Sequence, residues 1–129
     1  MANRVNNVPF HRSICILSSD RIFARLLAGL LRDQYHVLVA QEAEQVLSLL
    51  ARERMTLLLA DASQLISPLV SALNSRRKTS NGFPHVLIFL SSGDTRDILT
   101  RCIPISDRVL AKPPGTEDIM RAVLEMTTR

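Results

Sequence analysis

The sequence predicts an α/β fold, a single doubly wound parallel sheet of five βα units with helices on both faces. Two observations support this. Short apolar runs alternate with stretches in which apolar residues recur at helical spacing. Runs without polar alternation are typical of strands that helices cover on both faces, as in parallel sheets with right-handed crossovers. The chain has 129 residues, which suits one compact domain.

The N-terminal part of the chain predicts an arm followed by the first unit. Residues 1–11 are polar and predict a flexible arm, so the folded domain is expected over residues 12–129. Ser13–Leu17 predicts the first strand. Asp20 then precedes a predicted helix over residues 21–33, and its carboxylate can cap that helix. The apolar stripe expected to face the sheet comprises Ile22, Phe23, Leu26, Leu27, Leu30 and Leu31.

The middle of the chain predicts two further units. His36–Ala40 predicts the second strand and residues 42–53 the second helix. A run of four apolar residues then ends in a single carboxylate, Asp61, which predicts a buried strand with that carboxylate at its C-terminal end. Pro68 should displace the start of the next helix or kink it. Residues 76–82 are polar and basic, and predict a solvated loop.

The last two units bring further polar residues to strand ends. Residues 84–90 predict a buried strand that ends at Ser91 and Ser92, and residues 95–101 predict a helix. Residues 109–111 predict a short strand that ends at Lys112. Thr116 opens the final helix, whose residues expected to face the sheet are Ile119, Met120, Val123 and Leu124.

Asp61, Ser91 and Lys112 should meet at one edge of the sheet, because parallel strands end on the same side and ligands bind in the crevice beyond those ends. A carboxylate facing a lysine and a hydroxyl can form a phosphoryl site, in which Lys112 and Ser91 bind oxygens of a phosphate on Asp61. The alternative is an Asp–Lys ion pair that only closes the sheet.

The order and spacing of these residues resemble the receiver domain of two-component response regulators, the CheY-like family with a flavodoxin-like fold. The resemblance covers nearly the whole chain and implies the strand order 2-1-3-4-5. It also implies a phosphoacceptor role for Asp61, phosphate sensing by Ser91, and a phosphate-pairing role for Lys112, which Pro113 follows as in the family.

The chain departs from the receiver pattern at the metal site. Receivers carry an acidic pair after the first strand that helps to hold Mg²⁺, and here Ser18 and Ser19 stand in that place, with Asp20 beyond them. Asp20 and Asp61 are then the remaining candidate ligands. Mg²⁺ prefers carboxylate oxygens in octahedral geometry, so weak Mg²⁺ binding is expected. Val109 also stands where many receivers carry an aromatic switch residue.

These features predict an atypical receiver that works by protein–protein interaction, with weak or no Mg²⁺-dependent phosphorylation at Asp61, and not an enzyme. The alternative is a conventional receiver that a histidine kinase phosphorylates on Asp61. The resemblance implies a sensor histidine kinase or another signalling protein as partner. It also implies a possible homodimer through residues 95–129.

Composition argues against several other classes of function. The net charge is +4, and Arg76, Arg77 and Lys78 have no aromatic residues beside them, so nucleic-acid binding by this domain alone is not expected. No run reaches the length of a membrane span, and no glycine-rich loop for a nucleotide follows the first strand. Cys15 and Cys102 are too far apart for a zinc-type pair. Two isolated, reduced thiols indicate a cytoplasmic protein.

Overall fold

The computed structural model describes residues 13–52 and 54–128, and it confirms the predicted fold. The predicted arm, residues 1–11, lies outside the described residues, as do both ends of the predicted 12–129 domain. Five parallel strands form one sheet in the order β2-β1-β3-β4-β5. The elements are β1 (Ser13–Leu17), α2 (Arg21–Leu31), β2 (His36–Ala40), α3 (Ala43–Arg52), β3 (Leu57–Asp61), η2 (Ala62–Gln64), α4 (Ser67–Thr79), β4 (His85–Leu90), α5 (Arg96–Cys102), η3 (Ile103–Ile105), β5 (Arg108–Ala111) and α6 (Thr116–Thr127).

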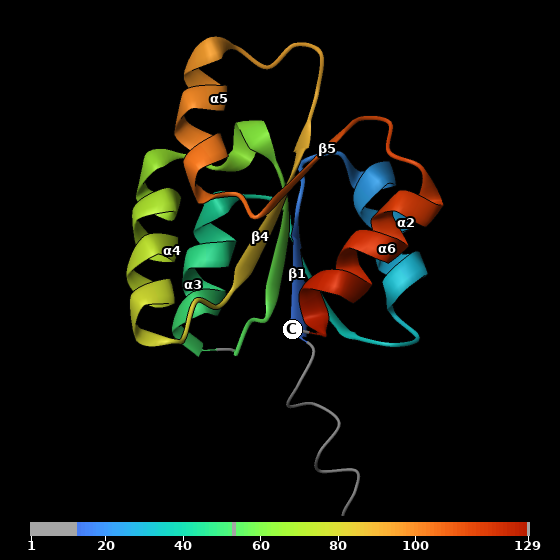
Figure 1. Cartoon of the computed structure of the whole chain (residues 1–129), viewed down its shortest axis with the longest axis horizontal. Coiled ribbons are helices and arrows are strands. Elements are labelled where there is room, and N and C mark those ends of the chain that lie inside the picture. The colour runs from blue at the N-terminus through green and yellow to red at the C-terminus, as the bar shows by residue number, and fades with distance from the viewer. Residues whose placement is uncertain (1–12, 53, 129) are drawn as a thin grey trace, which may run out of the picture.

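The sheet is the middle of three layers. Helices α2 and α6 cover one face, and α3, α4 and α5 cover the other (Figure 1). Side chains alternate between the two faces along each strand. On β1, Ile14 and Ile16 pack with α2 and α6, whereas Cys15 and Leu17 pack with the three helices opposite. The domain therefore has two cores, one on each side of the sheet.

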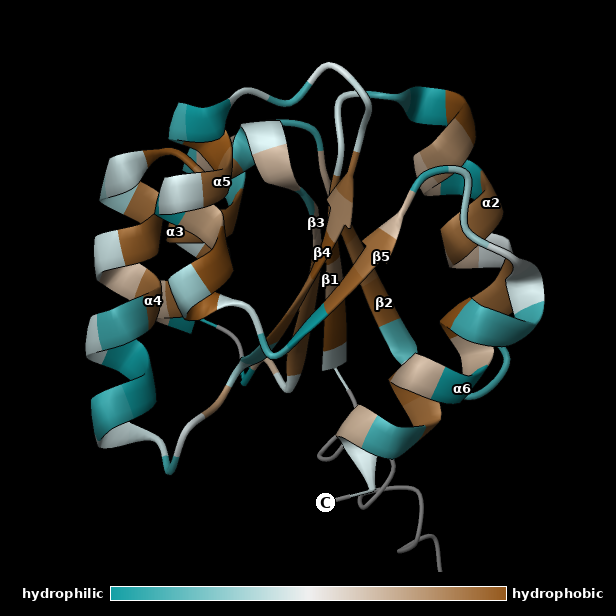
Figure 2. Cartoon of the chain, turned by 45° about the horizontal axis from the view of Figure 1, so that its top comes forward, coloured by the Kyte–Doolittle hydropathy of each residue, from teal (hydrophilic) through white to brown (hydrophobic). Residues whose placement is uncertain are grey.

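The strands differ in how far the helices cover them. Every residue of β1 and of β3 is buried, and so is the interior of β4. The edge strands β2 and β5 are instead partly exposed, and the side chain of Val39 on β2 is 46% exposed. The expectation that all five strands are buried on both faces was therefore wrong for the two edges. The apolar centre and the more polar outer helices are visible in Figure 2.

On two helices most residues of the predicted stripe face the sheet, and three residues of it point outward. On α2, Ile22 is 76% exposed and Leu26 is 63% exposed, whereas Ala24 and Ala28 are buried. The small alanine side chains let the helix backbone lie close to the sheet, which turns these larger residues outward. On α6, Leu124 is exposed at the position where burial was expected.

Helix α4 is longer than the sequence predicted. Pro68 lies in its first turn, where the missing N–H is not needed, so it displaces the helix start and does not kink the helix. The helix then continues to Thr79, so most of the predicted basic loop is helical. Its last turn is held by Arg76, which donates to the carbonyl of Leu50, and by Arg77. These residues have structural contacts and are not merely solvated.

Candidate functional site

Asp61 is the last residue of β3, so it lies at the carboxyl edge of the sheet. The residue is only 7% exposed. The hydroxyl of Ser18 donates a hydrogen bond of 2.6 Å to Asp61 Oδ2, and Lys112 Nζ lies 2.8 Å from Asp61 Oδ1. The Lys112 contact is an ion pair without hydrogen-bond geometry, so the attraction is mainly electrostatic. The predicted meeting of Asp61 and Lys112 is seen in the structure.

Lys112 is held at this edge from two directions. Its backbone N–H donates to the carbonyl of Leu90 at 2.8 Å, which extends the pairing of β5 with β4. Its peptide bond with Pro113 is cis. The ammonium group also lies 4.3 Å from the centroid of the Phe23 ring, a cation–π contact, and Phe23 meets Phe89 edge to face at 5.0 Å. Sequence reasoning assigned Phe23 to the core stripe and missed this contact.

Ser91 lies at the same edge but does not join the Asp61–Lys112 pair. It directly follows β4, on which Phe89 pairs with Asp61 across the ladder. Its backbone N–H donates to Asp94 Oδ2 at 2.7 Å, and the residue is exposed. Within the described residues, no hydrogen bond joins its hydroxyl to Asp61. Ser91 therefore faces solvent beside the carboxylate, where the hydroxyl remains accessible to a ligand.

Asp20, a candidate metal ligand, and its neighbour Ser19 both make hydrogen bonds to other parts of the protein. Asp20 Oδ1 accepts the backbone N–H of Phe23 at 3.1 Å, so this carboxylate caps α2, as its position predicted. The Ser19 hydroxyl accepts a hydrogen bond of 3.4 Å from the side chain of Gln64. No group of three or more His, Cys, Asp or Glu side chains suited to a metal ion occurs in residues 13–52 and 54–128.

The donor set next to Asp61 is thus one carboxylate accompanied by serine hydroxyls. Mg²⁺ is strongly hydrated and is usually held by carboxylates or phosphates, and a neutral hydroxyl adds no charge to hold it against its water. The Lys112 ammonium also repels a cation from Asp61 Oδ1. These residues therefore fit Mg²⁺ poorly. The same carboxylate can still act as a nucleophile or as an ion-pair partner, because neither role requires a second acidic residue.

Two thiols lie beneath this edge of the sheet. Cys15 and Cys102 are free and buried, as predicted. Burial raises the pKa of Cys15 from 9.0 to about 12. Burial also raises the pKa of Cys102, whose Sγ lies 3.1 Å from the carbonyl of Ala62. Both thiols are therefore protonated at neutral pH and take no part in the chemistry of the site.

No protein-family model matches the chain, and no curated protein matches it either. Many solved structures share the fold, however. One is a CheY-like response regulator receiver domain from Methanospirillum hungatei, with a TM-score of 0.75, 18% identity, and coverage of 92% of this chain and 94% of that one. Another is the signal receiver domain of an HD domain-containing protein from Pseudomonas fluorescens, with a TM-score of 0.74, 20% identity, and coverage of 92% and 94%.

A third structure is informative about the metal. It is the receiver domain of a sensor histidine kinase from Pseudomonas aeruginosa, with a TM-score of 0.75, 18% identity, and coverage of 92% of this chain and 99% of that one. That protein has a magnesium ion coordinated in its active-site cleft. Together with the strand order and the Asp61–Lys112 pair, these similarities show that this chain has the fold of the CheY-like response regulator receiver domains.

Proposed function

We propose that this chain is a receiver-like signalling domain that works by docking to other proteins, with weak or no Mg²⁺-dependent phosphorylation at Asp61. One observation carries the proposal. The Ser18 hydroxyl donates to Asp61 Oδ2 at 2.6 Å, at the position where receivers have a carboxylate that helps to hold the metal. The hydrogen bond and the Lys112 ion pair together occupy both oxygens of Asp61.

Electrostatics support this reading. Asp61 and Lys112 have opposite unit charges, so the pair is neutral as a whole and attracts Mg²⁺ less than two or three carboxylates would. Phosphoryl transfer to a carboxylate needs positive charge close to the negatively charged phosphoryl oxygens. Among the described residues in contact with Asp61, Lys112 is the group that supplies it. In a receiver that binds Mg²⁺, the ion supplies further positive charge. Without it, the rate of transfer to Asp61 should be low.

A conventional receiver is the second candidate, because two observations favour it. The exposed hydroxyl of Ser91 is accessible beside Asp61, and Lys112 Nζ is already 2.8 Å from the acceptor oxygen Oδ1. In this candidate, Lys112 and Ser91 would bind oxygens of a phosphate on Asp61. This candidate requires that water molecules complete a cation site that has one carboxylate.

For partners, we propose a sensor histidine kinase or another signalling protein, and a homodimer through residues 95–129. The exposed apolar side chains in that region are Ile103, Val109 and Leu124, at 49%, 37% and 55%. Val109 replaces the aromatic switch, so this face should not respond to phosphate through a rotating ring. Reduced, buried thiols accord with a cytoplasmic location, which is part of the same proposal.

The test is the intact mass of the protein after incubation with acetyl phosphate, with and without Mg²⁺, beside an Asp61→Asn control. The proposal expects little or no gain of a phosphoryl group under either condition while circular dichroism shows a folded protein. A complete Mg²⁺-dependent gain of one phosphoryl group that the control lacks would support the conventional receiver instead.

A double variant, Ser18→Asp with Ser19→Asp, makes a negative result interpretable. It supplies the acidic pair that receivers carry, next to an unchanged Asp61 and Lys112. We expect it to bind Mg²⁺ and to gain phosphoryl groups faster than the parent protein. If the parent and the double variant both stay unmodified, the missing acidic pair is not what limits phosphorylation, and the explanation offered here is wrong.

A further inference from the structure

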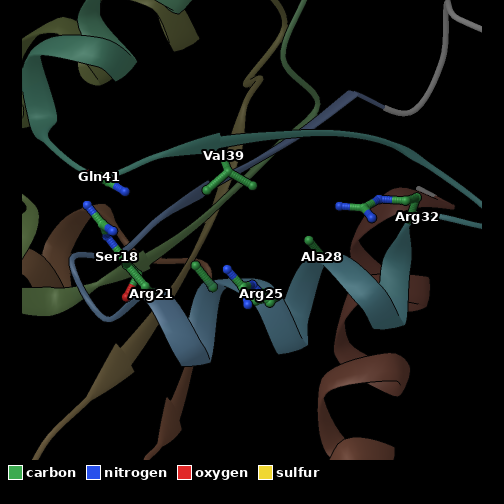
Figure 3. Close-up of a pocket in the computed structure, with 8 residues that line it drawn as sticks. Ser18, Arg21, Arg25, Ala28, Arg32, Val39 and Gln41 are labelled. Carbon is green, nitrogen blue, oxygen red and sulfur yellow. The ribbon is translucent and has the colours of Figure 1, made fainter.

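A groove of about 300 Å³ lies between α2 and the edge strand β2, and three arginines line it: Arg21, Arg25 and Arg32. They come from α2 and from the residue directly after it, and they share one side of the helix because their spacing follows its turns. Figure 3 shows Val39 pointing from β2 toward α2 across this groove. The sequence analysis did not identify this groove, although the helical spacing of the three arginines is visible in the sequence.

The arginines have no acidic partner within the part of the chain that the structure describes. The ion pairs found there involve other cations. Asp20, which precedes Arg21, is already engaged in capping the helix. Like charges one turn apart on a helix repel each other. The groove therefore holds three positive charges that an external anion would neutralise.

The shape of the groove indicates what kind of anion fits. The arginine row spans eleven residue steps of helix, roughly 16 Å. A single phosphate group covers only part of that length, whereas about five residues of extended peptide cover all of it. The alanines Ala24 and Ala28 and the half-exposed Val39 supply an apolar floor under the charged row.

The surroundings favour a peptide over a nucleic acid. The groove lining contains no aromatic side chain on which a base could stack. The apolar side chains of Ile22 and Leu26 are exposed on the same helix, beside the arginines. β2 is also the edge of the sheet, so one side of its backbone has no strand partner among the described residues. Carboxylates in an extended chain suit the planar donor groups of arginine.

We infer that the groove between α2 and β2 binds an extended, acidic segment of a partner protein through Arg21, Arg25 and Arg32. This rests on the proposed docking function and specifies the chemistry of the partner. Ser18 lines the groove and also donates to Asp61, so the peptide site and the acceptor carboxylate are neighbours.

The test uses fluorescence anisotropy of a labelled peptide of alternating glutamate and valine, about eight residues long so that it exceeds the arginine row. We expect it to bind the whole protein and to dissociate as salt is raised. Arg25→Glu, and separately Arg32→Glu, should weaken binding about tenfold or more, because each change removes a charged hydrogen-bond donor and adds a repulsive charge. The matched control is Arg54→Glu, which reverses an exposed charge before β3, outside the groove, and should leave affinity within about twofold.

Three results would overturn the inference: equal binding of a lysine and valine peptide, equal losses in Arg25→Glu and Arg54→Glu, or tighter Arg25-dependent binding of a single-stranded RNA oligonucleotide. The intact-mass assay with acetyl phosphate and the peptide titration, both run on the parent protein, separate the two proposals. If acetyl phosphate modifies Asp61 while the peptide still binds through Arg25, the proposed function fails and the groove stands. If Asp61 stays unmodified and the peptide does not bind, the groove fails alone.

Discussion

Two carboxylates at opposite ends of the sheet are held in different ways. Asp107, just before β5, accepts two hydrogen bonds from Arg77, at 2.9 and 3.0 Å, and one from the backbone N–H of Val86 at 2.8 Å. Asp61, at the carboxyl edge, has one serine hydroxyl and one lysine. Both hydrogen bonds from Arg77 come from one nitrogen, Nη2, of a rigid planar guanidinium, whereas a lysine is a mobile point charge.

The difference separates a structural ion pair from a site that can react. Arg77 also donates to the carbonyl of Ile105 at 2.7 Å, so the Asp107 end ties α4 to the segment before β5. Among the described residues, the Asp61 carboxylate contacts Ser18 and Lys112, and the exposed Ser91 follows the neighbouring strand β4. We therefore expect Asp107 to matter more for stability and Asp61 to matter more for function.

The largest effect is expected from Asp107→Ala. The change removes three hydrogen bonds and leaves Arg77 and the Val86 amide without their acceptor, so the free energy of unfolding should fall by about 3 kcal/mol. Urea unfolding followed by circular dichroism measures it. A loss no larger than that of an exposed surface pair would remove the distinction between the two carboxylates.

A smaller loss is expected from Lys112→Met. It leaves the Asp61 charge without its cation, but the Ser18 hydrogen bond to that carboxylate remains. We expect about 2 kcal/mol, less than a fully buried pair would lose. The same urea experiment applies. If Lys112→Met costs more than Asp107→Ala, then Asp61 is the more structural carboxylate.

Ser18→Ala should cost about 1 kcal/mol, because it removes a hydrogen bond to a charged acceptor that keeps its ion pair and the hydroxyl that accepts the backbone N–H of Asp20. The variant also tests the site, since it frees Asp61 Oδ2. Titration with Mg²⁺ should still show weak binding, because no carboxylate has been added. Tight Mg²⁺ binding by Ser18→Ala would mean that the serine hydrogen bond itself, and not the missing charge, keeps the metal away.

The smallest effect is expected for a third carboxylate, Asp118, on the surface of α6. It lies 3.4 Å from Arg121, and both side chains are about 60% exposed. Arg121→Ala should change the free energy of unfolding by less than about 0.5 kcal/mol. This variant gives the change in the free energy of unfolding for an exposed ion pair, with which the losses in the other three variants are compared. A larger change would show that exposure alone does not rank the ion pairs of this domain.

Much of the fold could be predicted because strands and caps are local features. The apolar runs that became β1 and β2 were placed at their observed bounds, and the role of Asp20 as a helix cap followed from its position before a periodic stretch. The outward faces of Ile22 and Leu26 could not be predicted in this way. Hydropathy does not show that two alanines allow the helix to lie close to the sheet.

The site was predicted in part for the same reason. Strand ends placed Asp61 and Lys112 together, because parallel strands share one edge. The contact between Lys112 and the Phe23 ring and the ion pair of Arg77 with Asp107 depend on side chains far apart in the chain, which meet only in three dimensions. No local pattern records such contacts. The extension of α4 into the basic stretch was missed because charged residues are common both in loops and in the last turns of helices.

The strand order also has a consequence for how the chain reaches its native state. Each pair of neighbouring strands joins residues separated by roughly twenty or more positions, as Leu87 and Arg108 are, and β1 must pair with both β2 and β3. No strand pair can form as a hairpin. Because long loops must close before such contacts stabilise the chain, folding should be slower than that of a helical bundle of the same size. On the ribosome, β1 can be flanked on both sides only after β3 has emerged.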